Sequence, residues 1–225
     1  LNRLVPSATL AMSQRSNEMM AQGINVINMS VGEPDFMTPD HVKEAGKKAI
    51  DDNFSKYSPV PGYLSLRKAI ANKLKRENNL NYSASEVIVG TGGKQGVCNT
   101  ILALVNPGDE VIIPAPYWVS YPQMVKLAGG EPVIVSAGIE QDFKVTADQL
   151  KAAITSKTKL IILCSPSNPT GSVYTKEELE ALAKIVLEHN DLFVLSDEIY
   201  EHINYIGCHA SIAACEGMKE RTIIC

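Results

Sequence analysis

Five short apolar segments alternate with helical patterns along most of this chain, and that alternation limits the fold more than any other feature. The segments are EVIVG, EVIIP, PVIVS, LIILC and LFVLS, at residues 86–90, 110–114, 132–136, 160–164 and 192–196. Helical patterns lie between them at residues 95–104, 118–127, 147–154 and 176–188. Strands that alternate with helices are joined by right-handed crossovers and form parallel sheets. We therefore expect an α/β fold of three layers, with a mainly parallel sheet between flanking helices.

The N-terminal part has a different pattern. We expect an irregular arm with a helix at residues 11–22, followed by a short strand, INVINMSVG, that ends at Gly32. From Thr38, the run TPDHVKEAGKKAI begins with a threonine cap and a proline in the first turn, which predicts a helix to about Asp51. A second helix is expected at residues 65–78. We predict an N-terminal arm and small-domain segment at residues 1–37 and a large domain at residues 38–225.

Composition and charge exclude several classes of function. The chain has 225 residues, 45% of them hydrophobic and 20% charged, which is enough to bury one substantial core. The net charge of -4 and the lack of clustered Lys and Arg argue against a nucleic-acid surface. The apolar runs are far shorter than the ~20 residues of a membrane helix, and no signal segment is visible, so a soluble cytoplasmic protein is expected.

The cysteines do not indicate a metal site. Their number is odd, and they show neither CxxC spacing nor histidine neighbours arranged as metal ligands; they are Cys98, Cys164, Cys208, Cys215 and Cys225. We expect free thiols in a reducing compartment and no bound metal.

Polar, turn-forming residues follow two of the apolar segments directly. LIILC is followed by SPSNPTG, and LFVLS by DEIY. Because ligands bind outside the carboxyl ends of parallel strands, Asn168, Asp197 and Tyr200 should converge on one site. Asp197 at a buried strand end needs a cationic partner, since an unpaired buried charge is costly. Taken alone, each motif also fits a plain turn or a helix cap.

Two further motifs suit a flat, anionic ligand. In TGGKQG, the glycines let backbone N–H groups approach an anion at a helix N-terminus, although the motif has neither Walker nor GxGxxG spacing. In APYWVSYP, Trp118 lies where its ring can stack on a planar ligand. The alternative for TGGKQG is a structural tight turn, and the alternative for Trp118 is packing in the core. Together, these features offer a partner for each group of pyridoxal 5'-phosphate. The glycine turn suits the phosphate, the tryptophan ring can stack on the pyridine ring, the carboxylate suits the ring nitrogen, and the phenol and amide suit the ring oxygen.

The motifs, in this order, resemble those of the class I aminotransferases of fold type I, bacterial aspartate aminotransferase branch. The resemblance covers essentially the whole chain. It is carried by PSAT at 6–9, SVGEPDF at 30–36, KYSPVPG at 56–62, GGKQ at 92–95, PGDEVIIPAPYWVSYP at 107–122, SPSNPTG at 165–171 and SDEIYEH at 196–202. Each motif is weak by itself, but the series is highly specific.

The resemblance implies roles for residues that contact the ring of the cofactor. Asp197 would pair with the pyridinium nitrogen, so that the ring withdraws electrons from the substrate. Tyr200 and Asn168 would bind the ring oxygen, and Trp118 would stack on the ring.

Phosphate binding is implied for the amides near Gly92, Gly93 and Lys94. The tyrosine that matches Tyr57 reaches the phosphate of the neighbouring subunit in the family. The resemblance therefore implies a homodimer in which each subunit completes the site of the other.

Substrate binding is implied for Gly32, Trp118 and Asn168, with Gly32 leaving space beside the substrate carboxylate. Lys94 and Thr9 match positions that help to bind the distal carboxylate of acidic substrates in the aspartate branch. The resemblance thus implies pyridoxal-phosphate-dependent transamination between aspartate or another acidic amino acid and a 2-oxo acid such as 2-oxoglutarate. Some relatives with this pair also use prephenate.

The family's Schiff-base lysine has no match within this chain. It belongs to a serine-or-alanine-lysine motif expected just after Cys225, and the arginine that grips the substrate lies further on. We expect a longer polypeptide whose C-terminal part is missing here. The alternatives are a carbon-sulfur β-lyase of the same fold, an inactive fragment, or a doubly wound nucleotide-binding enzyme. The absence of GxGxxG argues against the last of these.

Overall fold

The computed structural model describes residues 4, 8–30 and 32–225. Contacts within the chain divide it into two compact units, of which one spans residues 6–63 and the other holds residues 64–225. Each unit is described by itself. The predicted functional division after residue 37 stays a prediction.

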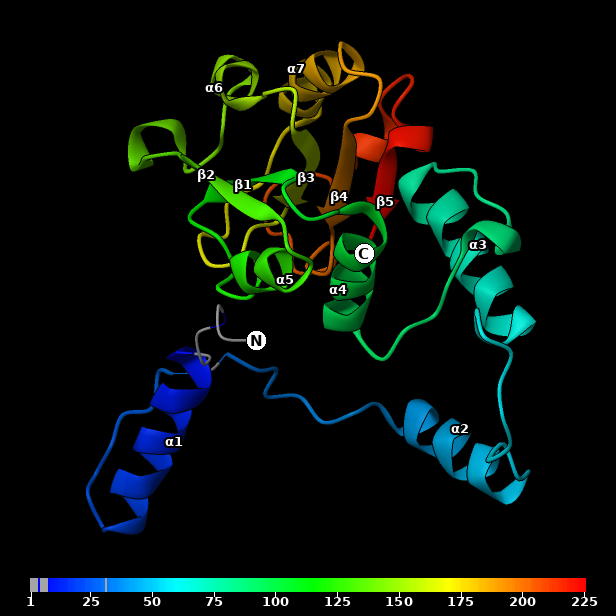
Figure 1. The fold of residues 1–225 in the computed structure, drawn as a ribbon. Helices are drawn as coiled ribbons and strands as arrows, with labels where there is room; N and C mark the ends of the chain where they lie inside the picture. Colours follow the sequence, from blue (N-terminus) through cyan, green and yellow to red (C-terminus); the bar gives the residue numbers. More distant parts are fainter. Residues whose placement is uncertain (1–3, 5–7, 31) are drawn as a thin grey trace. The chain divides into compact units, whose positions relative to one another are not determined.

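The unit at residues 64–225 contains a sheet of five strands. These are β1 (Glu110–Ala115), β2 (Glu131–Ser136), β3 (Thr158–Cys164), β4 (Phe193–Asp197) and β5 (Thr222–Ile224). Their order is β2-β1-β3-β4-β5, and each neighbouring pair is parallel (Figure 1). The prediction of an α/β fold with a mainly parallel sheet is confirmed.

Three helices connect successive strands: α5 (Tyr121–Leu127), α6 (Ala147–Ala153) and α7 (Lys176–Leu187). Two more, α3 (Leu64–Asn78) and α4 (Gly93–Leu104), precede β1. Capping boxes, Thr146 with Gln149 and Thr175 with Glu178, satisfy backbone N–H groups at the starts of α6 and α7 and fix where these helices begin. Short 3-10 turns are η1 (Ala84–Glu86), η2 (Ile139–Gln141), η3 (Ile212–Ala214) and η4 (Lys219–Arg221). Within the described residues, no helix is both long enough and apolar enough to span a bilayer.

The sheet is buried on both faces. Along β1, Ile112 belongs to one buried cluster, whereas Val111 and Ile113 belong to a second. The first cluster includes Leu150 of α6, and the second includes Ile101 of α4. Since side chains alternate along a strand, α6 and α7 cover one face while α4 and α5 cover the other (Figure 1). This is the expected three-layer arrangement.

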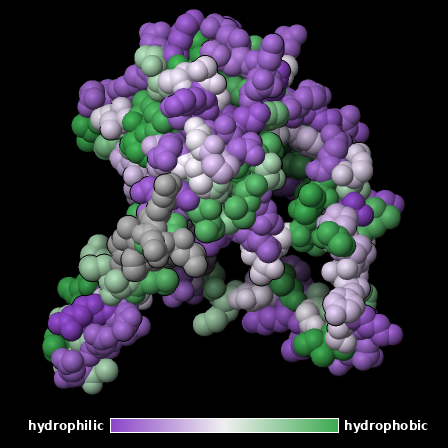
Figure 2. Space-filling view, in the orientation of Figure 1, coloured by the Kyte–Doolittle hydropathy of each residue, from purple (hydrophilic) through white to green (hydrophobic). Residues whose placement is uncertain are grey.

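The two helical layers differ at their outer surfaces. The surface over α6 and α7 is mostly hydrophilic, whereas hydrophobic residues gather over α4 and α5 (Figure 2). The exposed apolar residues there include Leu102, Val119 and Leu127. Contiguous exposed apolar surface is typical of a face that another molecule covers.

The unit at residues 6–63 contains α1 (Ala8–Ala21) and α2 (Asp40–Asp51). No residue of α2 is buried, and ion pairs such as Lys48 with Asp52 lie along its surface. Large apolar side chains of this unit are exposed, among them Ile27, Met29 and Phe36. The described part of this unit therefore has little core of its own.

Two predicted strands are wrong. Within EVIVG, Glu86 ends the η1 turn, whose Ser83–Glu86 capping box holds the chain, and residues 87–90 pair with no described strand. Val87 is buried while Ile88 is 79% exposed, so the side chains alternate between buried and exposed positions as they would in a strand. The segment nevertheless has no partner strand among the described residues. In INVINMSVG, residues 24–30 are also unpaired, and Ile27 and Met29 are exposed; Val31 lies outside the described residues. Alternating apolar residues predict an extended segment, but only a neighbouring strand makes it part of a sheet.

Candidate active site

The candidate site lies at the carboxyl ends of the strands. Asp197 is the last residue of β4 and is the register partner of Cys164, the last residue of β3. Asn168 follows β3, and Trp118 follows β1. The parallel sheet therefore brings three separate sequence motifs to one edge, as the general rule for such sheets predicts.

The structure brings Asn168 and Tyr200 into contact. The Asn168 side-chain amide donates a hydrogen bond to the Tyr200 hydroxyl at 3.1 Å. The chain reaches this position because it turns tightly after β4: the Glu201 N–H donates to the Glu198 carbonyl at 3.0 Å, and the Ile203 N–H donates to the Tyr200 carbonyl at 2.8 Å. An amide and a phenol thus face one another beside the end of β4.

Asp197 is a buried carboxylate, with only 7% of its surface exposed. Its Oδ2 accepts a hydrogen bond from the Tyr121 hydroxyl at 2.7 Å, and its Oδ1 accepts a longer one from the Ile199 N–H at 3.4 Å. Burial raises the pKa of Asp197, the two hydrogen bonds lower it, and the charge of Glu198 raises it further. No Lys, Arg or His among the described residues forms an ion pair with it. A cation placed beside Oδ1 would stabilise this carboxylate.

Tyr121 is a site residue that the sequence analysis did not single out. It is 2% exposed, and its ring meets that of Trp118 edge-on, with centroids 5.3 Å apart and planes at 89°. Burial first, then the neighbouring Cys164 and Asp197, raise the pKa of the Tyr121 hydroxyl, so it remains a hydrogen-bond donor. A buried tyrosine needs a partner for its hydroxyl, but the motif that contains Tyr121 does not indicate which residue provides it.

The glycine turn lies at the start of α4. Gly92 is the N-cap, with φ of 79°, and its N–H donates to the Gly90 carbonyl at 3.1 Å. The N–H groups of Gly93 and Lys94 have no acceptor among the residues that the structure describes. A Cβ built on Gly92 would meet no atom within 4 Å. Free amides, open space and the positive end of the helix dipole suit an anion such as a phosphate.

The glycine turn and Asp197 border the same space. The Lys94 ammonium lies 5.0 Å from the centroid of the Trp118 ring, and a Cβ built on Gly93 would lie 3.7 Å from Cδ1 of Ile199. Contacts therefore run in sequence around the site through Lys94, Trp118, Tyr121, Asp197, Ile199 and Gly93. An anion site, an aromatic face and a carboxylate without a cation thus occur within one set of contacts.

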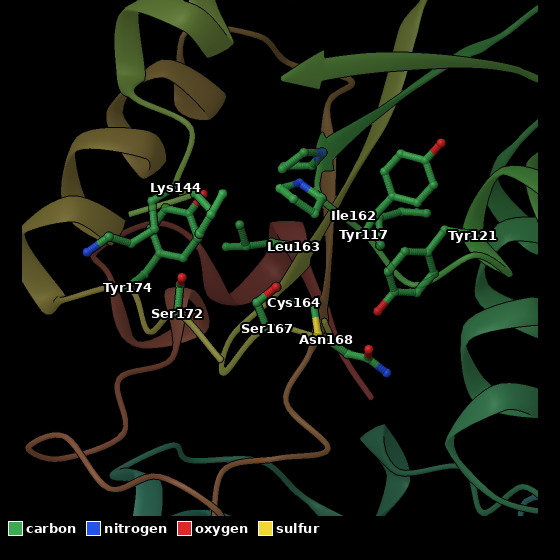
Figure 3. Close-up of a pocket in the computed structure, with 13 residues that line it drawn as sticks. Tyr117, Tyr121, Lys144, Ile162, Leu163, Cys164, Ser167, Asn168, Ser172 and Tyr174 are labelled. Carbon is green, nitrogen blue, oxygen red and sulfur yellow. The ribbon is translucent and has the colours of Figure 1, made fainter. Parts of the chain in front are cut away.

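A pocket borders the site. Tyr121, Cys164 and Asn168 line it together with Lys144 and Tyr174 (Figure 3). In this view the Tyr121 hydroxyl points toward Asn168 and Cys164. Burial raises the pKa of the Cys164 thiol to about 11, so this group is neutral at physiological pH. The pocket is therefore bordered on the Tyr121 side by neutral donors and acceptors.

Three predicted site residues, Thr9, Gly32 and Tyr57, belong to the unit at residues 6–63. Thr9 lies in α1, Gly32 is exposed, and Tyr57 is fully exposed in a loop. Their proposed contacts with cofactor and substrate stay predictions.

Known proteins resemble this chain over nearly its whole length. A family model described as aminotransferase class I and II matches residues 24–225. An aspartate/prephenate aminotransferase of Cereibacter sphaeroides is 50% identical over all of this chain, and an aspartate aminotransferase of a Bacillus species is 52% identical over 98% of it. The solved structure of an aspartate aminotransferase from Thermus thermophilus with maleate shares 45% identity over 99% of the chain, with a TM-score of 0.95.

An aromatic aminotransferase from Pyrococcus horikoshii is also similar, with 44% identity over 95% of the chain and a TM-score of 0.85. The chain spans 57% of the length of the two curated relatives, and 58% and 56% of the two solved chains. The match covers most of this chain at high identity, and it agrees with the resemblance of the motifs. The chain belongs to the class I and II aminotransferase family.

Proposed function

We propose that this chain is the cofactor-binding part of a pyridoxal-phosphate-dependent aminotransferase. The enzyme would transfer an amino group between aspartate, or another acidic amino acid, and a 2-oxo acid such as 2-oxoglutarate. The observation that carries the proposal is the buried carboxylate of Asp197, which has no ion-pair partner among the described residues and lies beside an aromatic ring and a glycine turn. We also propose a cytoplasmic location, which the free cysteines support.

The residues present fit pyridoxal 5'-phosphate. A protonated ring nitrogen would give Asp197 the cation that it lacks, and the Asn168–Tyr200 pair offers donors for the ring oxygen. The amides of Gly93 and Lys94 would bind the phosphate. When bound, the cofactor supplies an electron sink for the carbanion formed at the substrate α-carbon.

The site residues of this chain would have separate tasks in this mechanism. Asp197 would hold a proton on the ring nitrogen by its negative charge, which needs a dry site to be effective. Trp118 would fix the plane of the ring, because its own orientation is set by the edge-on contact with Tyr121. Asn168 and Tyr200 would fix the rotation of the ring within that plane. The lysine that moves the substrate proton is expected beyond Cys225.

A panel of amino donors with 2-oxoglutarate, applied to the full-length protein, tests the proposed activity. Aspartate and glutamate should be the preferred donors, and product formation should require the 2-oxo acid. Release of pyruvate from a cysteine conjugate without any 2-oxo acid would instead indicate a carbon-sulfur β-lyase. Since one similar structure is named an aromatic aminotransferase, aromatic donors belong in the panel.

Lys94 is proposed to select acidic donors. Its ammonium lies over the Trp118 ring, with no ion pair to any described residue. We expect Lys94→Met to reduce kcat/KM for aspartate roughly 10- to 100-fold, the worth of one charge-assisted hydrogen bond, and to change that for alanine much less. Lys126→Met on α5 is the control. An equal loss of kcat/KM for acidic and neutral donors would contradict the proposed role of Lys94 in selectivity.

Tyr57 is proposed to complete the active site of a partner subunit in a homodimer. Its side chain is fully exposed, and exposed apolar residues lie on both units, as expected of surfaces that dimerisation buries. We expect Tyr57→Phe to weaken cofactor binding about tenfold or more, because a hydrogen bond to a charged phosphate is lost.

Mixed dimers test whether Tyr57 acts across the interface. In a dimer of one Tyr57→Phe subunit and one Asp197→Asn subunit, action across the interface leaves one site with both residues intact. About half of the wild-type activity should then return, although either homodimeric variant is impaired. If Tyr57 acts within its own subunit, neither site is intact and activity stays low.

A further inference from the structure

We propose that Tyr121 is a positioning residue that aims one oxygen of the Asp197 carboxylate at the cofactor. This inference rests on the proposed function. Tyr121 is the first residue of α5, and its hydroxyl donates to Oδ2 of Asp197 at 2.7 Å across a separation of 76 residues. The same ring meets Trp118 edge-on. One buried side chain thus holds two of the proposed cofactor contacts.

The two oxygens of Asp197 are used unequally. Oδ2 receives the short bond from Tyr121, whereas Oδ1 receives only the 3.4 Å bond from the Ile199 N–H. A carboxylate oxygen has two lone pairs, so Oδ1 can still accept a short, charge-assisted bond. Holding Oδ2 fixes the rotation of the carboxylate and leaves Oδ1 for the ring nitrogen.

Tyr121 also favours the charged form of Asp197. Burial raises the pKa of this carboxyl, and the Tyr121 hydrogen bond is the largest effect that lowers it. The other titratable groups near Asp197 are Cys164 of β3, Cys225 after β5, and Glu198. Burial raises the pKa of each of the two thiols to about 11, so they stay neutral over the useful pH range. Glu198 acts in the opposite sense to Tyr121, since its charge raises the pKa of Asp197.

A second buried tyrosine provides a matched control. Tyr174 is 5% exposed and belongs to the cluster on the other face of the sheet. Its hydroxyl accepts a hydrogen bond from the Val145 N–H at 2.7 Å. Tyr121→Phe and Tyr174→Phe each remove one buried hydroxyl and keep the ring, but only Tyr121→Phe removes a bond to Asp197.

The first test measures unfolding of the full-length, cofactor-free protein between about pH 4 and pH 8. Because Tyr121→Phe raises the pKa of Asp197 in the folded state, the charged form is disfavoured, and stability is lost as the pH rises above the unfolded-state pKa. The fall in melting temperature relative to wild type should therefore be largest near pH 8 and shrink toward pH 4. The fall caused by Tyr174→Phe should not vary with pH. Equal pH profiles for the two variants would overturn the proposal.

The second test measures pyridoxal phosphate affinity by its visible absorbance across the same pH range. In wild type, affinity for pyridoxal phosphate should decline on acidification around a midpoint pH. In Tyr121→Phe this midpoint should rise by about one pH unit, because the loss of one hydrogen bond to a charged group corresponds to a pKa shift of about that size. The shift should vanish in the Asp197→Asn background. An unchanged midpoint in Tyr121→Phe would overturn the role of Tyr121. If Asp197→Asn alone leaves affinity unchanged, the proposed cofactor contact fails instead.

Discussion

Asp197→Asn in the full-length protein is expected to reduce kcat/KM for transamination roughly 10²- to 10³-fold or more. Asparagine keeps the size of the side chain and a hydrogen-bond partner for Tyr121, but it cannot balance a protonated ring nitrogen. Breaking a buried ion pair from one side costs about 3–5 kcal/mol, and each 1.4 kcal/mol is about tenfold in rate. Steady-state kinetics with aspartate and 2-oxoglutarate measure the loss. The control is Asp191→Asn, an exposed acid before β4.

The same substitution should stabilise the protein when the cofactor is absent. The folded-state pKa of Asp197 is raised above its usual value, chiefly by burial, so the charged carboxyl opposes folding once the pH exceeds its unfolded pKa. Cofactor-free Asp197→Asn should therefore melt above wild type at neutral pH, with the gain disappearing as the pH falls through the folded-state pKa. A residue that destabilises the cofactor-free protein but is needed for the activity of the cofactor-bound protein is typical of an active site. Lower stability at neutral pH together with unchanged kinetics would show that Asp197 is structural.

The layered core was predictable because its signals are local. The apolar runs that became β1 to β4 are each followed or preceded by a helix with a clear start signal, such as the capping box of Thr175 and Glu178. The edge of the sheet where the candidate site lies also followed, because parallel strands place their carboxyl ends together. These inferences need only periodicity and the direction of the chain.

The errors arose where the outcome depends on a distant partner. Val87 and Ile88 alternate like strand residues, but the described sheet offers them no neighbouring strand. Tyr121 lay inside a quoted motif, yet its hydroxyl partner is 76 residues away, and no local pattern indicates that contact. Pairing between segments is set by the folded arrangement, so it could be recognised only after the sheet order was known.

Glu198 shows how two neighbouring acids can have separate environments. It is 6% exposed and accepts hydrogen bonds from the hydroxyls of Ser196 at 2.7 Å and Ser211 at 2.6 Å on Oε1, while His209 Nε2 lies 2.8 Å from Oε2. Asp197, the preceding residue, uses none of these partners. Glu198 and His209 thus join the two ends of the segment that carries Tyr200.

His209→Ala is expected to destabilise the full-length protein by about 3 kcal/mol, because it leaves Oε2 of a buried carboxylate without its partner. His202→Ala is the matched control: its imidazole lies 3.3 Å from Glu77, but its side chain is 73% exposed, so little change is expected. Urea unfolding of both variants measures the difference, and equal effects would contradict the assigned role of burial.

Tyr200 lies in the segment whose two ends are joined by the Glu198–His209 contact. His209→Ala should therefore also weaken pyridoxal phosphate binding, whereas His202→Ala should not. His209→Gln, which keeps a donor near Oε2, should restore part of both losses, because the requirement is for a hydrogen-bond donor at that oxygen.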